Sequence, residues 1–373
     1  MKIFQGLYTC FAIMGSGSSA LRGTKFLQHK KHLVRYYSTN DDYITSGTKN
    51  IELLSSNQEL SPVIDKFLVS RLITKQFPKF KDYPISPILP GGWDNRVFRL
   101  GEDMLIRMPS AKKYEVQVEK EYKWLPKLSP LLPLRIPEPI EIGHEDEIYP
   151  WKWSIYKWID GEIAAKAKVA SLPEFARQLA NFLNTLQKID SDGAPTPGIH
   201  NFYRGAPLSH YDKEVRLAIE ALKDKMDALV ITKIWEESAS TVWNTKPVWL
   251  HGDVSAGNLL VNKGKLSAVI DFGMLGSGDP ACDLAIAWTF FDKETRKEFN
   301  SFLQTNEDVW IRGRGWGLWK ALIVSAELTN TNVIEKANSW RVLKEIVGDY
   351  LEDHGNQHSQ SEIIGESFHD NHE

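Results

Sequence analysis

The chain has 373 residues, of which 42% are hydrophobic and 25% charged, with a formal net charge of −3. This length is sufficient for two domains of ordinary size, and the apolar content argues against a wholly disordered chain. The charge balance shows no nucleic-acid footprint, and two cysteines, Cys10 and Cys282, are too few for a disulfide framework. No apolar run reaches the roughly 20 residues that a transmembrane helix needs.

Residues 1–60 are expected to be a targeting or disordered N-terminal extension. From Met1 to Asn40 there is no Asp or Glu, whereas six positions are Lys or Arg. An acid-poor, basic and Ser-containing segment is typical of a mitochondrial transit peptide, and "VRYYSTNDD" resembles a processing site. We therefore expect a protein of the mitochondrial matrix. A disordered basic tail on a cytoplasmic protein and a secretory signal are the alternatives.

Residues 61–160 are predicted to form a small, sheet-rich lobe. Ser61-Pro62 resembles a helix start, and an apolar stripe with helical spacing follows at Val63, Phe67, Ile73 and Phe77. A second helix is expected over 114–128, from the spacing of Val118, Leu125 and Leu128. We place the strands of this lobe at 86–89, 96–100, 104–108, 138–143 and 151–158.

Residues 161–353 are predicted to form a larger, helical lobe. We place its helices at 173–189, 209–229, 231–242, 282–291, 310–328 and 335–352. The only strands expected there are "LLVN" and "LSAVID", which form a hairpin around "KGK" at 263–265. The predicted class is therefore α+β and bilobal, followed by a polar, disordered tail at 354–373.

The hairpin lies inside the stretch "HGDVSAGNLLVNKGKLSAVIDFG", residues 251–273. Asp253 and Asn258 have the spacing of a kinase catalytic loop, and His251 precedes the Asp as in H-R-D. A carboxylate at Asp253 would accept the proton of an acceptor hydroxyl. Asn258 and Asp271 supply the oxygen ligands that Mg²⁺ prefers, and the hairpin returns the chain so that both face one cleft.

Three motifs, "HGDVSAGN", "IDFG" and "GSGDPACDLAIAW", together resemble the aminoglycoside/macrolide phosphotransferase and choline-kinase-like family. The resemblance covers about 80–353. It implies the bilobal protein-kinase-like fold and a Mg-ATP-dependent transfer of phosphate to a hydroxyl of a small molecule. It also implies that His251 and Asp283 support the catalytic loop.

The nucleotide loop is less closely matched. "LPGGWDNRVFRLG", residues 89–101, resembles the family's loop between strands, so the backbone N–H groups of Gly91 and Gly92 are expected to approach phosphate. The connector "YKWIDGE" is expected to offer adenine its backbone hydrogen bonds near Lys157 and Trp158.

Arg107 stands where a kinase carries Lys on the following strand. A guanidinium can bind two phosphate oxygens at once, but its planar donor geometry differs from that of the compact lysine ammonium. We expect Glu121 to orient it, with Glu119 as the competing acid.

A small hydroxylated acceptor is favoured over a protein because only seven residues separate Asp271 from Asp279 and no A-P-E follows. The tryptophans and acids of the last helices would suit a cationic or sugar-like ligand. Alternatively, the tryptophans pack the core and the acids face solvent. These residues are Trp310, Trp316, Trp319, Trp340, Glu327, Glu335, Glu345 and Asp349. The segment 200–212 either lines the acceptor cleft or caps the lobe.

Two other functions remain open. Arg107 in place of Lys would fit a nucleotide-binding pseudokinase or scaffold, and an atypical protein kinase is the third hypothesis. We prefer the enzyme because Asp253, Asn258 and Asp271 are all present.

Overall fold

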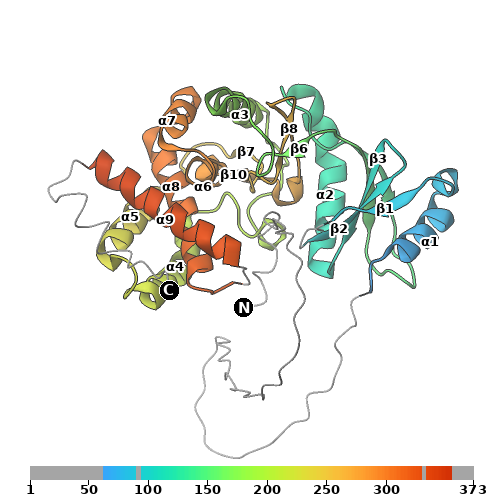
Figure 1. Ribbon diagram of the computed structural model, residues 1–373, viewed down its shortest axis with the longest axis horizontal. Helices are drawn as coiled ribbons and strands as arrows, with labels where there is room; N and C mark the ends of the chain where they lie inside the picture. Colours follow the sequence, from blue (N-terminus) through green and yellow to red (C-terminus); the bar gives the residue numbers. More distant parts are fainter. Residues whose placement is uncertain (1–61, 90–93, 330–332, 355–373) are drawn as a thin grey trace, which may run out of the picture. The chain divides into compact units, whose positions relative to one another are not determined.

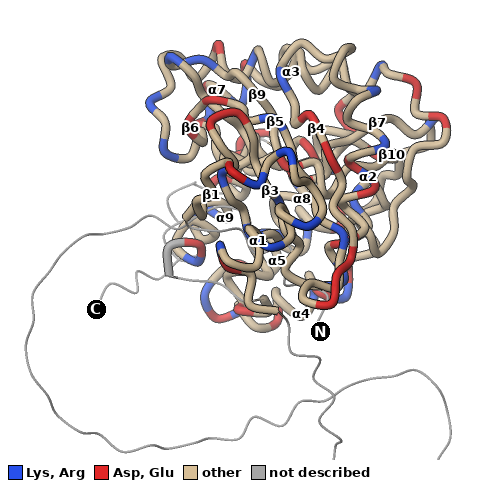
Figure 2. The backbone as a smooth tube through the Cα atoms, turned by 90° about the vertical axis from the view of Figure 1, so that its right-hand side faces the viewer, with Lys and Arg blue, Asp and Glu red and all other residues tan. Residues whose placement is uncertain are grey.

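The computed structural model of the chain describes residues 62–89, 94–329 and 333–354 (Figure 1). The predicted extension 1–60, the pair Gly91 and Gly92, and all of the predicted tail except His354 lie outside the described residues. No helix in the described ranges is long and apolar enough to cross a membrane. Basic and acidic residues are interspersed along the described backbone, as Figure 2 shows.

The N-lobe is built on a five-stranded antiparallel sheet with the order β1-β2-β3-β5-β4. All five predicted strands are present within a few residues of their expected places. Their bounds are β1 Ile85–Pro87, β2 Asn95–Leu100, β3 Met104–Pro109, β4 Pro139–Gly143 and β5 Trp153–Lys157. Strands β2 and β3 form the expected hairpin, in which Asn95 lies opposite Pro109 and Gly101 turns the chain with a φ of 60°.

The first helix, α1 (Lys66–Gln76), begins later than predicted. Its N-cap is Asp65, whose carboxylate accepts from the backbone N–H of Leu68 at 2.9 Å, so Ser61 is not the cap. The predicted stripe was also wrong in its first half, because Val63 and Phe67 are about four-fifths exposed. The buried stripe is instead Val69, Leu72 and Ile73, which follows from the later start.

Helix α2 (Lys112–Leu128) links the sheet to the rest of the molecule. Val118, Leu125 and Leu128 are buried, as their spacing predicted. The helix contacts β4 on one side and the turn at Phe272–Met274 on the other. Figure 1 shows it in teal between the sheet and the helical part of the chain.

The C-lobe is helical, and its central helix α8 packs against α4, α5 and α9. The helices are α3 Leu172–Lys188, α4 Asp212–Leu222, α5 Ala228–Ser240, α6 Ile286–Thr289, α7 Lys293–Phe302, α8 Glu307–Ser325 and α9 Val333–Asp353. The single helix predicted over 209–229 was wrong. It ends at Leu222, and Asp227 caps α5 by accepting from Leu229 and Val230.

Two further helical predictions need correction. The helix expected over 282–291 is instead a 3-10 turn, Pro280–Ala285, followed by one short helix, α6. Helix α7 was not predicted, because its sequence "KETRKEFNSF" is polar and buries few apolar side chains. It is capped by Asp292, which accepts from Thr295 N at 2.8 Å.

The predicted hairpin is formed by β8 (Leu259–Asn262) and β9 (Lys265–Val269). Lys263 and Gly264 both have positive φ, which is typical of the tight turn that joins twisted strands. Three short strands were not predicted: β6 Glu162–Ile163, β7 Val248–Leu250 and β10 Gly276–Gly278. β10 pairs with β7, so the segments on either side of residues 251–273 are joined to each other. β6 pairs with β8 of the hairpin.

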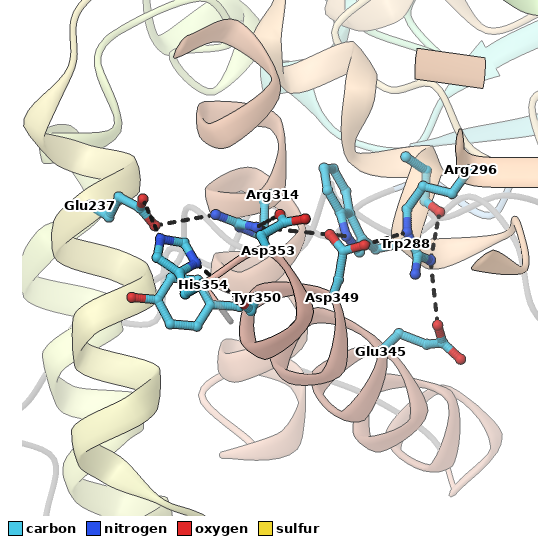
Figure 3. A network of polar contacts seen from close by, with 10 residues as sticks. Glu237, Trp288, Arg296, Arg314, Glu345, Asp349, Tyr350, Asp353 and His354 are labelled. Atoms are coloured by element: carbon cyan, nitrogen blue, oxygen red, sulfur yellow. Dashed lines mark hydrogen bonds and ion pairs between the residues drawn. The ribbon is translucent and has the colours of Figure 1, made fainter. Parts of the chain in front are cut away.

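Helix α9 is fixed by a network of buried arginines, shown in Figure 3. Arg296 donates to Asp349 at 3.0 Å and to Glu345 at 3.3 Å, and Trp288 also donates to Asp349. Arg314, about 1% exposed, lies 3.8 Å from the same Asp349 carboxylate. Glu345 and Asp349 therefore neutralise buried cations, so neither is a free acid for a ligand.

Candidate active site

The catalytic loop follows β7, and Asp283 fixes its backbone by hydrogen bonds. The buried carboxylate accepts from the backbone N–H groups of His251 at 2.8 Å and Gly252 at 2.7 Å. Burial raises the pKa of Asp283, while His251 and these hydrogen bonds oppose the rise. Gly252 has a φ of 85°, and a Cβ there would lie 2.5 Å from the Met274 carbonyl oxygen. The loop therefore requires glycine at this position.

His251 ties the loop to the residues that follow β9 and lead to Asp271. Its Nδ1 accepts from the N–H of Asp253 at 3.2 Å, which assigns the ring proton to Nε2. Nε2 then donates to the Ile270 carbonyl at 3.0 Å. The His251 ring thus connects the residue after β9 with the backbone of Asp253.

Asn258 is oriented by Asp253. Its Nδ2 donates to the Asp253 carbonyl at 2.9 Å and to Oδ2 of the side chain at 3.0 Å. The amide oxygen of Asn258 therefore remains as an acceptor for a cation. The backbone N–H of Ile270 donates to the Asn258 carbonyl at 2.8 Å, which holds Asn258 beside the approach to Asp271.

Arg107 joins the two lobes at this point. Its Nη1 donates to both carboxylate oxygens of Glu121 at 2.9 Å, and Nη2 donates to Asp271 Oδ1 at 2.8 Å. Burial opposes the charge on Arg107, but the two carboxylates more than offset it and hold its pKa above the usual range. Tyr156 also hydrogen-bonds to Glu121, whereas Glu119 is exposed and pairs with a lysine elsewhere.

Asp271 itself has a left-handed backbone with a φ of 64°. Such a conformation costs on the order of 1 kcal/mol or more in a residue other than glycine, and it is common in catalytic sites. Phe272 behind it is fully buried, and its ring meets His251 edge-on at 4.5 Å between centroids. The packing of Phe272 therefore helps to set the direction of the Asp271 side chain.

A cavity of about 350 Å³ lies between the N-lobe sheet and the β8–β9 hairpin. Its apolar walls come from both lobes: Ile88, Val97, Leu105, Pro137, Ile163, Leu260 and Ile270. Its polar end contains Asp94, Arg107, Asn258 and Asp271. An apolar slot with a charged end suits a nucleotide, whose base is flat and whose phosphates are anionic.

Trp158 lines this cavity, but its N–H donates to the Asp103 carbonyl at 2.7 Å. The N–H of Lys157 likewise donates to Glu138, at 2.9 Å. We expected adenine near Lys157 and Trp158, but the backbone N–H groups of both residues are already bonded within the N-lobe. Ile159, the next residue in the cavity wall, is a better position for a backbone hydrogen bond to a base.

Asp94 was not predicted as a site residue, although it lies two residues after the glycine pair. Burial, together with the negative charge of Asp271, raises the pKa of Asp94 to about 8. Its Oδ1 has no hydrogen-bond partner among the described residues. A cation at this end of the cavity would satisfy it.

The donor set fits a hard divalent cation. One carboxylate (Asp271) and one amide oxygen (Asn258) leave room for phosphate and water oxygens, which is the usual Mg²⁺ arrangement in phosphoryl transfer. The described residues contain no group of three or more His, Cys, Asp or Glu side chains that could hold a metal.

The segment 200–212 supports the catalytic loop. Arg204 is buried, and its Nε donates to the Gly252 carbonyl at 2.8 Å. Its guanidinium lies 5.0 Å from the rings of Trp316 and Trp319. Both tryptophans are almost fully buried, so they pack the core and do not wall an acceptor cleft. Neither Arg204 nor its role could be recognised from a local motif.

The sequence matches the phosphotransferase enzyme family over residues 86–317. The chain belongs to this family. The predicted resemblance and the predicted enzyme class, a small-molecule phosphotransferase, are thereby confirmed. A search of curated protein sequences found no match.

Solved structures of phosphotransferases are similar over most of the chain. An aminoglycoside phosphotransferase with GDP and kanamycin has a TM-score of 0.59 and 18% identity, covering 76% of this chain and 99% of its own. One with streptomycin and ATP has a TM-score of 0.51 and 18% identity, with 81% and 99% covered. Macrolide 2'-phosphotransferase type I has a TM-score of 0.52 and 16% identity, with 75% and 97% covered. The predicted kinase-like fold is confirmed.

Proposed function

We propose that the protein transfers the γ-phosphoryl group of Mg-ATP to a hydroxyl of a small molecule. The observation that carries this proposal is that Asn258 and Asp271 lie together at the charged end of one cavity, and that Asn258 donates to the Asp253 carboxylate at 3.0 Å. Phosphoryl transfer depends mainly on positioning and charge neutralisation, and this group of residues offers both.

In the proposed reaction, Asp253 accepts the proton of the acceptor hydroxyl. The acceptor oxygen forms a bond to the γ-phosphorus as the bond to the β–γ bridging oxygen breaks, and ADP leaves with that electron pair. Asn258 and Asp271 would hold Mg²⁺, which when bound neutralises charge on the phosphates. Arg107 keeps Asp271 and the N-lobe helix in register for this step.

We further propose an acceptor that is neutral or anionic near its reacting hydroxyl. The cation that faces the catalytic carboxylate is Lys320, 3.6 Å from Asp253. Three of the acids that would have suited a cationic ligand are paired elsewhere, Glu345 and Asp349 with Arg296 and Glu327 with a lysine. A polycation would therefore meet repulsion beside Asp253.

The test is nucleoside diphosphate release from Mg-ATP, and in parallel Mg-GTP, by the full-length protein. The acceptors are matched neutral, amino and carboxylated sugars, amino-alcohols, and aminoglycosides as cationic controls. Asp253→Asn keeps the shape of the side chain but cannot take the proton. We expect release that depends on a neutral or anionic acceptor and is lost in Asp253→Asn, while Mg-nucleotide still raises Tm.

Three results would contradict the proposal in different ways. Nucleotide binding without release to any acceptor would favour a pseudokinase. Label transferred to a protein in a lysate would favour an atypical protein kinase. Turnover restricted to aminoglycosides would leave the kinase intact and refute the acceptor class.

We also propose that residues 1–60 direct the protein to mitochondria, on the basis of their basic, acid-poor composition. Fused to a fluorescent protein in a eukaryotic cell, this segment is expected to co-localise with a mitochondrial marker. Uniform cytoplasmic fluorescence would favour the basic-tail alternative.

A further inference from the structure

Lys320 reaches the catalytic carboxylate from α8, a helix that sequence motifs do not associate with the site. Its Nζ lies 3.6 Å from Asp253 Oδ1, and its side chain is only 26% exposed. The neighbouring Trp316 and Trp319 are buried against Arg204, which is itself bonded to the catalytic loop. The Lys320 ammonium therefore extends from a helix that is closely packed next to it.

Close packing also fixes α8. A Cβ at Gly313 would lie 2.7 Å from the Leu284 Cβ, and one at Gly315 would lie 2.5 Å from the Ser238 Cβ. The helix thus approaches its neighbours more closely than side chains would permit at these positions. This approach sets the distance of Lys320 from the loop.

The two oxygens of Asp253 face different partners. Oδ2 accepts from Asn258, which lines the nucleotide cavity, and Oδ1 faces Lys320. The oxygen on the side away from the cavity is the natural one for an incoming hydroxyl. An acceptor hydroxyl that donates to Oδ1 at about 2.7 Å would lie beside the Lys320 ammonium. The phosphorus atom that this hydroxyl attacks would then lie beside the ammonium as well.

Lys320 is the cation that forms an ion pair with Asp253 within the described residues. The loop residues between Asp253 and Asn258 are Val, Ser, Ala and Gly. Arg107 is held by Glu121 and Asp271 on the opposite side. Charge that spreads over the transferred oxygens in the transition state therefore has Lys320 as its nearest described cation on the acceptor side.

We propose that Lys320 is a catalytic residue, whose ammonium binds the oxygens of the transferred phosphoryl group. The inference rests on the proposed phosphotransfer. Lys320 keeps its proton throughout, while the acceptor proton goes to Asp253 and the bond to ADP breaks. Preorganised donors of this kind contribute about 10²–10³-fold to kcat.

The experiment uses the full-length protein with Mg-ADP alone, and with Mg-ADP plus aluminium fluoride, which mimics the transferring phosphoryl group. Tm is the readout for the wild type, Lys320→Met, Lys320→Arg and the control Lys213→Met, which changes an exposed lysine on α4. ATP hydrolysis, with water as the acceptor, is the second readout.

In the wild type, fluoride should raise Tm beyond the Mg-ADP shift. Lys320→Met should keep the Mg-ADP shift but lose the extra shift, and its hydrolysis rate should fall about 100-fold or more at unchanged KM for ATP. Lys320→Arg, which keeps the charge and guards against a folding defect, should retain part of the fluoride shift. Lys213→Met should match the wild type.

The proposal is overturned if Lys320→Met keeps the fluoride shift, because Lys320 would then only support the loop. It is also overturned if the wild type binds Mg-ADP but fluoride adds nothing. A wild type that binds no nucleotide would refute the proposed function itself, a result distinct from both.

Discussion

Lys120 carries a buried amino group where α2 meets the C-lobe. It is 7% exposed, and its Nζ lies 3.1 Å from Nδ1 of His200. Burial lowers the pKa of Lys120 to about 7, although the Glu121 carboxylate acts in the opposite direction. In the unfolded chain the same group titrates near 10.4. Replacing it with Met, which has a similar length and no charge, should therefore stabilise the protein at neutral pH.

The sign of the pH dependence follows from the depressed pKa. Between about pH 7 and 10 the unfolded state binds more protons than the folded state, so wild-type stability rises with pH. Below pH 7 the penalty of the buried amine is at its maximum. With about 1.4 kcal/mol for each pKa unit, Lys120→Met should gain up to about 3 kcal/mol more at pH 6.5 than at pH 9.5. Relaxation around the amine makes this an upper limit.

Urea unfolding of the wild type and Lys120→Met at both pH values measures this difference. Lys123→Met is the matched control, because Lys123 is an exposed lysine on the same helix. The control should change stability by the same small amount at both pH values. An equal effect of Lys120→Met at pH 6.5 and 9.5 would refute the reasoning, since it would mean that Lys120 does not titrate between them.

Two further predictions concern buried ion pairs. Arg107→Lys should weaken Mg-ADP binding about 10-fold by calorimetry, because one ammonium cannot hold both Glu121 and Asp271 in the guanidinium's geometry; unchanged affinity would contradict this. Asp279→Ala should cost about 3–5 kcal/mol in urea unfolding, because it leaves the buried Arg312 guanidinium, 2.6 Å from Asp279, without its carboxylate. Adding Arg312→Met should recover most of that loss, and a double variant no more stable than the single one would show that the charge is not the cause.

Most of the sheet and the longer helices were predictable, because their patterns are local. Strand alternation and the two-residue turn at Lys263-Gly264 depend only on neighbouring residues. The errors arose where a cap or a tertiary contact outweighed the pattern. Asp65 rather than Ser61 starts α1, and β10 exists only because β7 lies beside it.

The sequence by itself determined that Asp253, Asn258 and Asp271 come together, because they lie on a short loop and an adjoining hairpin whose geometry is local. It did not determine which charged groups surround them. Lys320 comes from a helix far along the chain, and no local spacing relates it to Asp253. Only the packing of α8 against α4, α5 and α9 decided that contact, because the position of a packed helix depends on every surface that it touches.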